Sequence, residues 1–408
     1  MFNFWQLFQG FYTLFTSEPQ IAIGRVVLIL LGFLLIYLGY KKVLEGLIMI
    51  PMGLGMIAVN SAFLIMDAGR YGTIFLDPLV SDPSTLMNIL QINFLQPIYT
   101  FTFSNGLIAC LVFLGIGAIT DIDFLIANPL PSMLLAVAAE FGTIFVFPIA
   151  LAVGLNPGQA ASAAIIGGAD GPMVLFTSLM LAKDLFVPIT VVGYLYLSLT
   201  YGIYPFLIKW LVPKRLRGVT MDVRTIPQIP RSEKFAFAVV ITAVLTLLFP
   251  VAGPLYLAFF LGVAIKESDL PHHLHFLSET VLYGATFFLG LLLGTLLSAD
   301  VILDPKVLAL LALGLLAILL SGLGGLVGGL IAYKITKGKI NPLVGIAAVS
   351  CVPTTAKVAQ KEAFAVNKRA MILPFAMGAC VAGVVTTSII AGIYITGIPL
   401  VTEFLTAP

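Results

Sequence analysis

The chain has 408 residues, of which 60% are hydrophobic and only 10% are charged, with a formal net charge of +2. A soluble domain has roughly 25% charged residues, so the composition excludes an ordinary soluble protein. The nearly neutral net charge also gives no reason to expect a nucleic-acid partner.

Apolar stretches of about 20 residues recur along the chain, and each is long enough to cross ~30 Å of hydrocarbon. They indicate an all-α polytopic membrane protein, surrounded by a lipid bilayer. The expected spans are 21–40, 44–64, 104–119, 131–153, 186–212, 235–250, 252–265, 275–298, 306–333 and 370–396. Two further segments, 160–182 and 341–361, are apolar but are interrupted by glycine and proline.

The basic residues gather in a few connecting segments. They are Lys41 and Lys42, the loop 213–234, the group 334–339 and the group 357–369. Cytoplasmic loops of membrane proteins are enriched in Lys and Arg. All four groups fall on one side only if both interrupted segments enter and leave the membrane by the same face. The first segment would then open to the outside and the second to the cytoplasm.

The two halves of the chain carry similar motifs in the same order. FLGIGAIT at 113–120 is followed by a long apolar span and the break GGADGP. FLGLLLGT at 288–295 is followed by a long apolar span and the break NPLVGIAAVSCVP. We predict two inverted repeats, each with a broken, re-entrant segment, and the two breaks meet near the membrane midplane. The alternative is a chance likeness between short apolar strings.

These patterns divide the chain into six predicted segments. They are an interfacial N-terminal segment 1–20, an N-terminal hairpin with an external loop 21–103, repeat 1 at 104–212 with its break at 165–172, a basic cytoplasmic loop 213–234, a short helical pair 235–274, and repeat 2 at 275–396 with its break at 341–353. For the first segment a disordered leader is the alternative.

The break GGADGP places a carboxylate, Asp170, inside an apolar stretch. Glycine and proline stop a helix and leave backbone amides and carbonyls unpaired, which lipid does not tolerate. Such a break needs a protein or water-filled surrounding, and with the carboxylate it makes a cation or proton site. The alternative is that Asp170 caps a helix at a surface loop.

Other polar residues in the spans each allow two interpretations. Asn341 is suited to cap a loop or to bind an ion. Glu140 is suited to a structural role or to a position on the path of an ion. The Ser350 hydroxyl is suited to bind a hard cation or to donate a hydrogen bond to a carbonyl oxygen of its own helix. Lys357 is suited to bind an anionic substrate, or to extend its ammonium group to the cytoplasmic interface. Tyr194 and Tyr196 suit packing in the span or a functional position.

Several motifs together resemble one known family. In order they are LIYLGYKKVLEGLIMIPMGLGMIAVN, FLGIGAITDIDFLIANP, IIGGADGP, GYLYLSL, PKRLRGVTM, IKES, FLGLLLG, NPLVGIAAVSCVPTTAKVAQK and MGACVAGVV. Their order and spacing are similar to those of the β subunit of biotin-dependent, sodium-pumping decarboxylases, which act on oxaloacetate, methylmalonyl-CoA or glutaconyl-CoA. The resemblance runs from Arg25 to the last span.

The resemblance implies functional residues. Asp170 matches the family's central ion and proton site, Tyr196 its functional tyrosine, and Lys357 stands where the family has an arginine. These three are the expected catalytic residues. The expected sodium ligands are Asp170, Asn341, Gly345 and Ser350, and no other metal site is expected. Cys380 and Phe375 replace a family asparagine and histidine, and a thiol is a poor ligand for a hard cation.

The resemblance also implies a function, namely decarboxylation of carboxybiotin with uptake of a proton and export of Na⁺. Carboxybiotin would be carried on a biotin carrier protein or domain, not on this chain. The other expected partners are a carboxyltransferase α subunit and a small membrane γ-type subunit, and the expected location is the bacterial inner membrane. One alternative is a sodium-coupled secondary transporter of an organic anion. Another is a silent membrane anchor for a soluble decarboxylase.

Overall fold

The computed structural model describes residues 7–65, 71–78, 82–222, 227–299, 305–351 and 353–406. Residues 1–6 of the predicted interfacial segment and Val352 of the second predicted break therefore lie outside the described residues. The chain forms two compact units, one made of residues 1–108 and 283–310, the other of 109–282 and 311–408. The six predicted segments stay a prediction.

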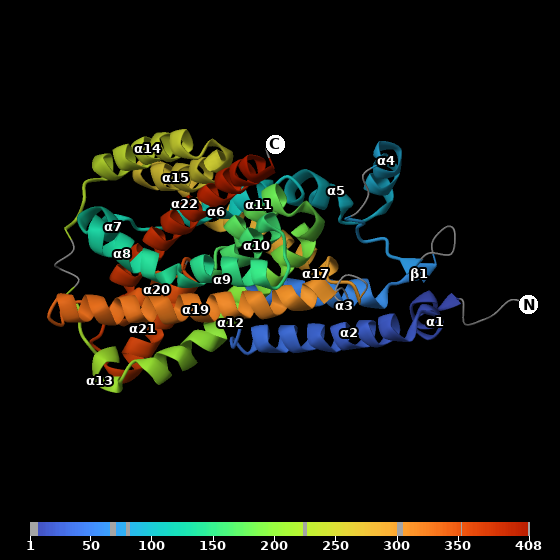
Figure 1. Ribbon diagram of the computed structural model, residues 1–408, viewed down its shortest axis with the longest axis horizontal. Coiled ribbons are helices and arrows are strands. Elements are labelled where there is room, and N and C mark those ends of the chain that lie inside the picture. Colours follow the sequence, from blue (N-terminus) through green and yellow to red (C-terminus); the bar gives the residue numbers. More distant parts are fainter. Residues whose placement is uncertain are drawn as a thin grey trace, which may run out of the picture. The chain divides into compact units, whose positions relative to one another are not determined.

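The first unit consists of helices and one small antiparallel sheet (Figure 1). Its elements are α1 (Gln9–Thr16), α2 (Pro19–Tyr40), α3 (Gly46–Ser61), β1 (Leu64–Ile65), β2 (Tyr71–Gly72), α4 (Pro83–Ile92), α5 (Gln96–Ile98), the π-helical turn η3 (Tyr99–Phe103) and most of α17 (Leu282–Thr295).

A buried arginine holds the N-terminal part of this unit together. Arg25, on α2, is only 1% exposed. Its guanidinium donates to the carbonyl oxygens of Asn60 at 2.9 Å and Gly10 at 3.1 Å, and to the Thr13 hydroxyl at 3.2 Å. It also lies over the Phe63 ring, 4.5 Å from its centre. One charged group thereby links α1, α2 and the end of α3.

The second unit contains both predicted breaks. Its elements are α6 (Leu107–Ile119), α7 (Asp123–Ala127), α8 (Pro129–Ala139), α9 (Phe141–Ala152), α10 (Pro157–Ala164), the 3-10 turn η4 (Ile165–Gly168), α11 (Gly171–Leu181), η5 (Lys183–Leu185), α12 (Phe186–Leu211), α13 (Lys214–Arg217), α14 (Arg231–Leu248), η7 (Pro250–Ala252), α15 (Gly253–Glu267), α16 (Pro271–His275), η8 (Phe276–Val281), most of α19 (Pro305–Ile335), α20 (Leu343–Ala347), α21 (Thr354–Val366) and α22 (Leu373–Thr406).

Among the described residues, seven helical stretches are long and apolar enough to cross a membrane. They are Pro19–Tyr40, Pro129–Ala152, Lys183–Leu211, Pro250–Glu267, Pro271–Thr295, Lys306–Ile335 and Leu373–Glu403. The pair Gln96–Phe103 and Leu107–Ile119, bent by 67°, would make an eighth.

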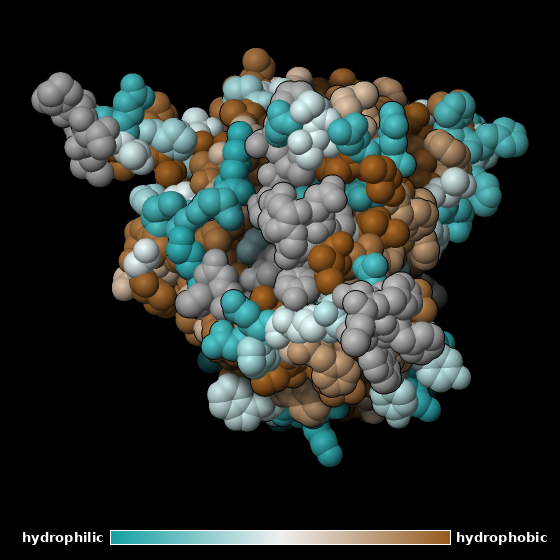
Figure 2. Space-filling view, turned by 90° about the vertical axis from the view of Figure 1, so that its right-hand side faces the viewer, coloured by the Kyte–Doolittle hydropathy of each residue, from teal (hydrophilic) through white to brown (hydrophobic). Residues whose placement is uncertain are grey.

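Many large apolar side chains lie on the surface, as Figure 2 shows for one face, and Phe15, Trp210 and Leu247 are each more than 75% exposed. Exposed apolar surface on this scale suits contact with lipid. The prediction of a mainly helical, multi-pass membrane protein is confirmed.

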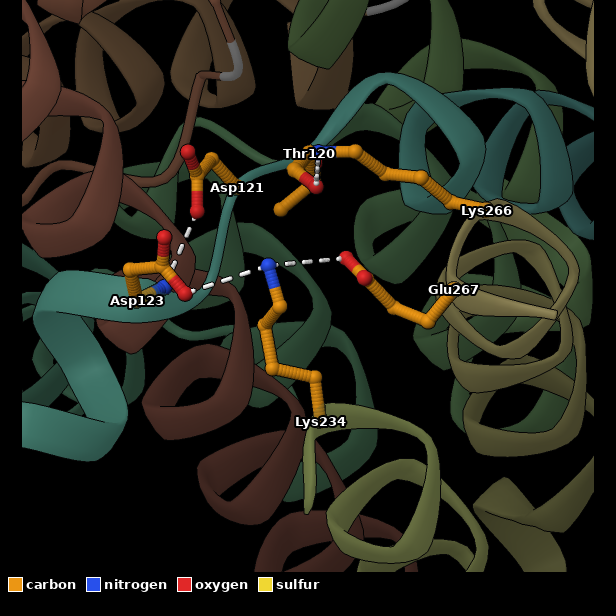
Figure 3. A network of polar contacts seen from close by, with 6 residues as sticks. All are labelled: Thr120, Asp121, Asp123, Lys234, Lys266 and Glu267. Atoms are coloured by element: carbon orange, nitrogen blue, oxygen red, sulfur yellow. Dashed lines mark hydrogen bonds and ion pairs between the residues drawn. The ribbon is translucent and has the colours of Figure 1, made fainter. Parts of the chain in front are cut away.

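The expected short helical pair is a hairpin of α14 and α15. Lys234, at the start of α14, lies between two carboxylates, 3.2 Å from Asp123 on α7 and 3.3 Å from Glu267 on α15 (Figure 3). Beside it, Lys266 donates to the Thr120 carbonyl oxygen at 2.5 Å. These contacts hold one end of the hairpin against the start of α7 and the segment that joins α6 to α7.

The ionisation of Lys234 favours this contact at neutral pH. Burial alone lowers the pKa of Lys234, but Asp123 and Glu267 outweigh burial, and the pKa is raised. Stability from a group whose pKa is higher in the folded chain is present below its unfolded pKa and lost as the pH rises through the folded value. The contact therefore persists at neutral pH, and loss of the Lys234 proton weakens it in strongly alkaline solution.

We expect Lys234→Met to lower the free energy of unfolding by about 1–3 kcal/mol, because two poorly hydrated carboxylates lose their cation. Adding Glu267→Gln should restore part of the loss, because it removes one of the orphaned charges. Thermal unfolding of the full chain in detergent measures both effects. A double variant less stable than Lys234→Met alone would contradict this explanation.

Candidate functional site

The first break is the closed tip of a helical hairpin whose arms are α10 and α11. A Cβ atom on Gly158, near the start of α10, would lie 2.2 Å from the carbonyl oxygen of Leu181, at the end of α11. Further along the arms, the Ser162 hydroxyl lies 3.5 Å from the Thr177 carbonyl oxygen. The arms therefore run antiparallel, with residues 165–170 at the tip.

The tip turns sharply before Asp170. Ala169 has a φ of 51°, in the left-handed region that alanine adopts only at a cost. This turn ends η4 and lets α11 begin afresh, with Asp170 as its N-cap and Pro172 in its first turn. One Asp170 carboxylate oxygen, Oδ1, accepts from the backbone N–H of Met173 at 3.3 Å.

The other carboxylate oxygen of Asp170 has no hydrogen-bond partner among the described residues. The residue is only 4% exposed, and no ion pair within the described ranges includes it. Asp170 is thus both the helix cap and the buried acid that the sequence analysis set out as alternatives. A buried carboxylate oxygen without a partner needs a proton or a cation.

The second break is also anchored at its open end. The Asn341 side-chain amide donates to the carbonyl oxygens of Arg217 at 2.9 Å and Val219 at 2.7 Å, and its oxygen accepts from the Leu343 N–H. Glu362, on α21, forms an ion pair of 3.6 Å with the Arg217 guanidinium. The start of α20 and the far part of α21 therefore meet at one place, just beyond α12.

The two hairpins approach each other from opposite ends of α12. The first hairpin leads directly into the N-terminus of this helix, and the second is tied to Arg217 beyond its C-terminus. A helix of 26 residues is about 39 Å long. Their tips nevertheless touch, because the Ser350 N–H and hydroxyl donate to the Gly168 carbonyl oxygen at 3.1 and 2.6 Å.

A row of polar side chains continues from this contact. The Ser350 hydroxyl lies 2.9 Å from the Thr387 hydroxyl on α22, and the Thr387 hydroxyl bonds to the Glu140 carboxylate. The other oxygen of that carboxylate accepts from the Thr143 hydroxyl at 2.5 Å. Glu140, at the junction of α8 and α9, is fully buried. The meeting point of the breaks is therefore lined with oxygen atoms, which suit a hard cation.

The two tyrosines of α12 have different surroundings. The Tyr194 ring lies against the first break, because a Cβ atom on Gly171 would be 2.3 Å from it, and its buried hydroxyl has no partner among the described residues. The Tyr196 hydroxyl instead donates to the Leu311 carbonyl oxygen at 2.6 Å. Tyr196 is the site residue expected from the family resemblance, whereas Tyr194 is the tyrosine whose ring packs against Gly171, next to Asp170.

Two other predicted site residues lie in different settings. Gly345 packs on α19, where a Cβ atom would be 2.1 Å from the Gly325 carbonyl oxygen, so a close helix contact requires glycine there. Lys357 is exposed on α21 and lines an open surface pocket of about 380 Å³. The pocket is lined by Lys357, Gln360, Lys361, Phe364, Met371 and Leu373.

Cys380 and Phe375, which stand where the family has an asparagine and a histidine, are both buried. The Cys380 thiol lies 3.4 Å from the Thr355 hydroxyl, and the Phe375 ring packs edge-on against Phe124 at 5.4 Å. Asp170 and Ser350 are thus on the two touching tips, while Asn341, Gly345 and Lys357 make their contacts elsewhere in this unit. The roles assigned to all of these residues stay predictions.

Comparison with known proteins gives a consistent family match. The model of the family described as Na⁺-transporting oxaloacetate decarboxylase beta subunit matches residues 24–398. A carboxybiotin decarboxylase of Malonomonas rubra is 55% identical over 390 residues, covering 96% of this chain and 97% of the relative. A methylmalonyl-CoA decarboxylase subunit beta of Propionigenium modestum is 33% identical, covering 95% and 96%. An oxaloacetate decarboxylase beta chain of Haemophilus ducreyi is 32% identical, covering 95% and 97%.

The contact between Gly171 and Tyr194 predicts coupled effects on stability. Gly171→Ala alone should cost about 1–3 kcal/mol, because the new methyl group would overlap the tyrosine ring. In a Tyr194→Ala background the same change should cost at least ~1 kcal/mol less, since the ring is gone. Thermal unfolding of the four chains completes this double-mutant cycle. Additive costs would show that the ring lies elsewhere.

Proposed function

Because the chain belongs to the Na⁺-transporting oxaloacetate decarboxylase beta subunit family, we propose that it decarboxylates carboxybiotin held by a partner protein and couples this reaction to sodium export. The family resemblance found in the sequence is confirmed, and the chain is the multi-pass membrane subunit of a decarboxylase. The observation that carries the proposal is the buried, unpaired oxygen of Asp170 beside two touching helix breaks.

The reaction needs one proton for each molecule of carboxybiotin. The bond between the ring nitrogen and the carboxyl carbon breaks, carbon dioxide leaves, and the nitrogen takes up a proton. Asp170 is the group that exchanges a proton for a sodium ion. Burial favours its protonated form and a nearby cation favours its carboxylate, so the arrival of one ion releases the other.

The chemistry of the site suits a hard cation, and sodium is one. The polar atoms at the tips are carboxylate, hydroxyl and carbonyl oxygens, from Asp170, Ser350 and Gly168. Hard cations prefer such ligands. Asn341 and Gly345 hold the second hairpin in place through the loop after α12 and through α19, and that support keeps the Ser350 hydroxyl at the tip.

Lys357 belongs to a region that suits the anionic carboxybiotin group. The surface pocket on α21 carries two ammonium groups, from Lys357 and Lys361. The polar groups of Gln360 are already used, because they bond to the backbone of residues 370, 372 and 373. The carboxylate of an arriving carboxybiotin group is attracted to the lysines before it moves toward the tips.

The wider arrangement extends the same proposal. The two hairpins are the broken segments of inverted repeats, and their tips meet near the membrane midplane. The chain works in the bacterial inner membrane, with a carboxyltransferase α subunit, a biotin carrier protein or domain and a small γ-type membrane subunit. The relatives named as decarboxylase beta chains support the presence of other subunits.

We expect Asp170→Asn to lower sodium-dependent decarboxylation of carboxybiotin at least ~100-fold, because an amide cannot exchange a proton for sodium. The measurement is carbon dioxide release by full-length protein in proteoliposomes supplied with carboxybiotin, with and without Na⁺. Asp269→Asn is the matched control, because Asp269 is an exposed carboxylate whose one ion pair with a described residue is with exposed Arg231.

Normal sodium-dependent turnover by Asp170→Asn would contradict the role of this residue. Sodium-driven uptake of an organic anion by the wild-type chain, with no carbon dioxide released from carboxybiotin, would instead identify a secondary transporter.

The two tyrosines should give different results. Tyr194→Phe removes the buried hydroxyl beside Asp170 and should lower turnover ~10-fold or more with little effect on unfolding. Tyr196→Phe removes the hydrogen bond to Leu311 and should cost about 1 kcal/mol of stability. Turnover and thermal unfolding of both variants test this. The reverse pattern would support Tyr196, and not Tyr194, as the functional tyrosine.

A further inference from the structure

Positive charge is concentrated on the surface around the pocket of α21. Ten exposed lysine and arginine side chains come from three segments, three of them from residues 209–222, three from 334–341 and four from 354–370. We call these ten cations the basic surface. The same three segments contain two acids, of which Glu362 is buried and Asp222 is exposed. Positive charge therefore greatly exceeds negative charge in this part of the second unit.

The three segments lie together because they bond to three consecutive residues after α12. The Asn341 amide, at the end of the second segment, donates to the Arg217 and Val219 carbonyl oxygens of the first. The Asn367 amide, in the third segment, donates to the Gly218 carbonyl oxygen at 2.8 Å. In Figure 1, α13 and α21 accordingly lie side by side at one end of the second unit. The ten cations thus form one continuous surface.

These charges have few partners within the chain. Among the described residues, Lys209 is the one member of the basic surface with an ion pair, 3.4 Å from Glu362. Cations just outside the surface are treated differently, since Lys234 lies between two carboxylates and Arg231 pairs with Asp269. The location of basic residues on one side of a membrane does not require them to be unpaired. Crowded like charges repel one another, and an acidic partner would relieve this repulsion.

Apolar side chains are exposed among these cations. Phe364, Val366 and Met371 are 37%, 40% and 49% exposed, and two of them line the pocket. The Lys368 ammonium group lies over the Phe364 ring, 4.5 Å from its centre. Aromatic and methionine side chains are enriched where proteins bind one another. The basic surface therefore combines charge with an apolar hollow, which fits a protein partner better than a layer of lipid headgroups.

We propose that the basic surface is the docking surface for an acidic face of the soluble protein domain that carries carboxybiotin. This inference rests on the proposed function, in which carboxybiotin arrives at the pocket of Lys357 and Lys361. A domain that places its biotin group in this pocket must cover the rim of the pocket, and the rim is basic. Attraction between opposite charges speeds the encounter and orients the domain.

The test compares two synthetic peptides, each with one carboxybiotinyl-lysine, flanked either by glutamates or by glutamines. Carbon dioxide release is measured with the full-length chain in phosphatidylcholine nanodiscs at constant Na⁺, and choline chloride sets the ionic strength. At low ionic strength the KM of the glutamate peptide should be at least ~10-fold lower than that of the glutamine peptide. The difference should fall below ~2-fold at about 0.5 M salt, because salt screens exposed charges.

Neutral variants outside the pocket show where the preference arises. A chain with Lys214→Gln, Arg215→Gln, Lys368→Gln and Arg369→Gln should lose most of the preference for the glutamate peptide. Its kcat and KM for the glutamine peptide, and its thermal unfolding, should stay as in the wild-type chain, because all four side chains are exposed.

Arg231→Gln is the matched control and should keep the preference, because Arg231 is an exposed cation outside the basic surface.

Equal KM values for the two peptides in the wild-type chain would overturn the docking surface, and so would an undiminished preference in the fourfold variant. The proposed function would stand in both cases. Equal KM values together with phosphatidylglycerol that co-purifies with the wild-type chain but not with the fourfold variant would identify a lipid-binding surface instead. Failure of the wild-type chain to decarboxylate either peptide would overturn the proposed function itself.

Discussion

The contact between Ser350 and the Gly168 carbonyl oxygen is the constraint on which the site depends. Each hairpin is costly by itself, because a helix that breaks within an apolar interior leaves backbone groups without partners. The N–H and hydroxyl of one tip satisfy a carbonyl of the other, so each break supplies what the other lacks. The same contact lies two residues before Asp170, which caps the next helix, and Gly168 itself packs against Thr387 on α22.

Buried carboxylates near the two tips differ in their charge partners from buried carboxylates elsewhere in the second unit. Asp170 and Glu140 are both buried, and the described residues give neither an ion pair. Elsewhere in the second unit, buried carboxylates do have cationic partners, as Glu362 has in Arg217 and Glu267 in Lys234. The fold therefore pairs Glu362 and Glu267 with cationic side chains, whereas the described residues give Asp170 and Glu140 no such partner.

The sequence predicted the breaks but not all of their partners. Asp170 was recognisable because glycine, proline and a carboxylate interrupt an apolar stretch, and that signal is local. The contact between Ser350 and Gly168 joins residues 182 positions apart and leaves no local pattern. Tyr194 and Tyr196 illustrate a second limit, because residues two apart on a helix face different directions and their surroundings depend on packing. Glu140 was noticed as a buried acid, but only the structure placed it in a row with Thr387.

The most direct test of this account is an experimental structure of the full-length chain in sodium-containing buffer, at a resolution that shows ions. We expect the Ser350 hydroxyl and the Gly168 carbonyl to remain together, with cation density among the surrounding oxygen atoms that disappears when choline replaces sodium. Tips that lie apart, with lipid or apolar side chains between them and no ion nearby, would contradict it.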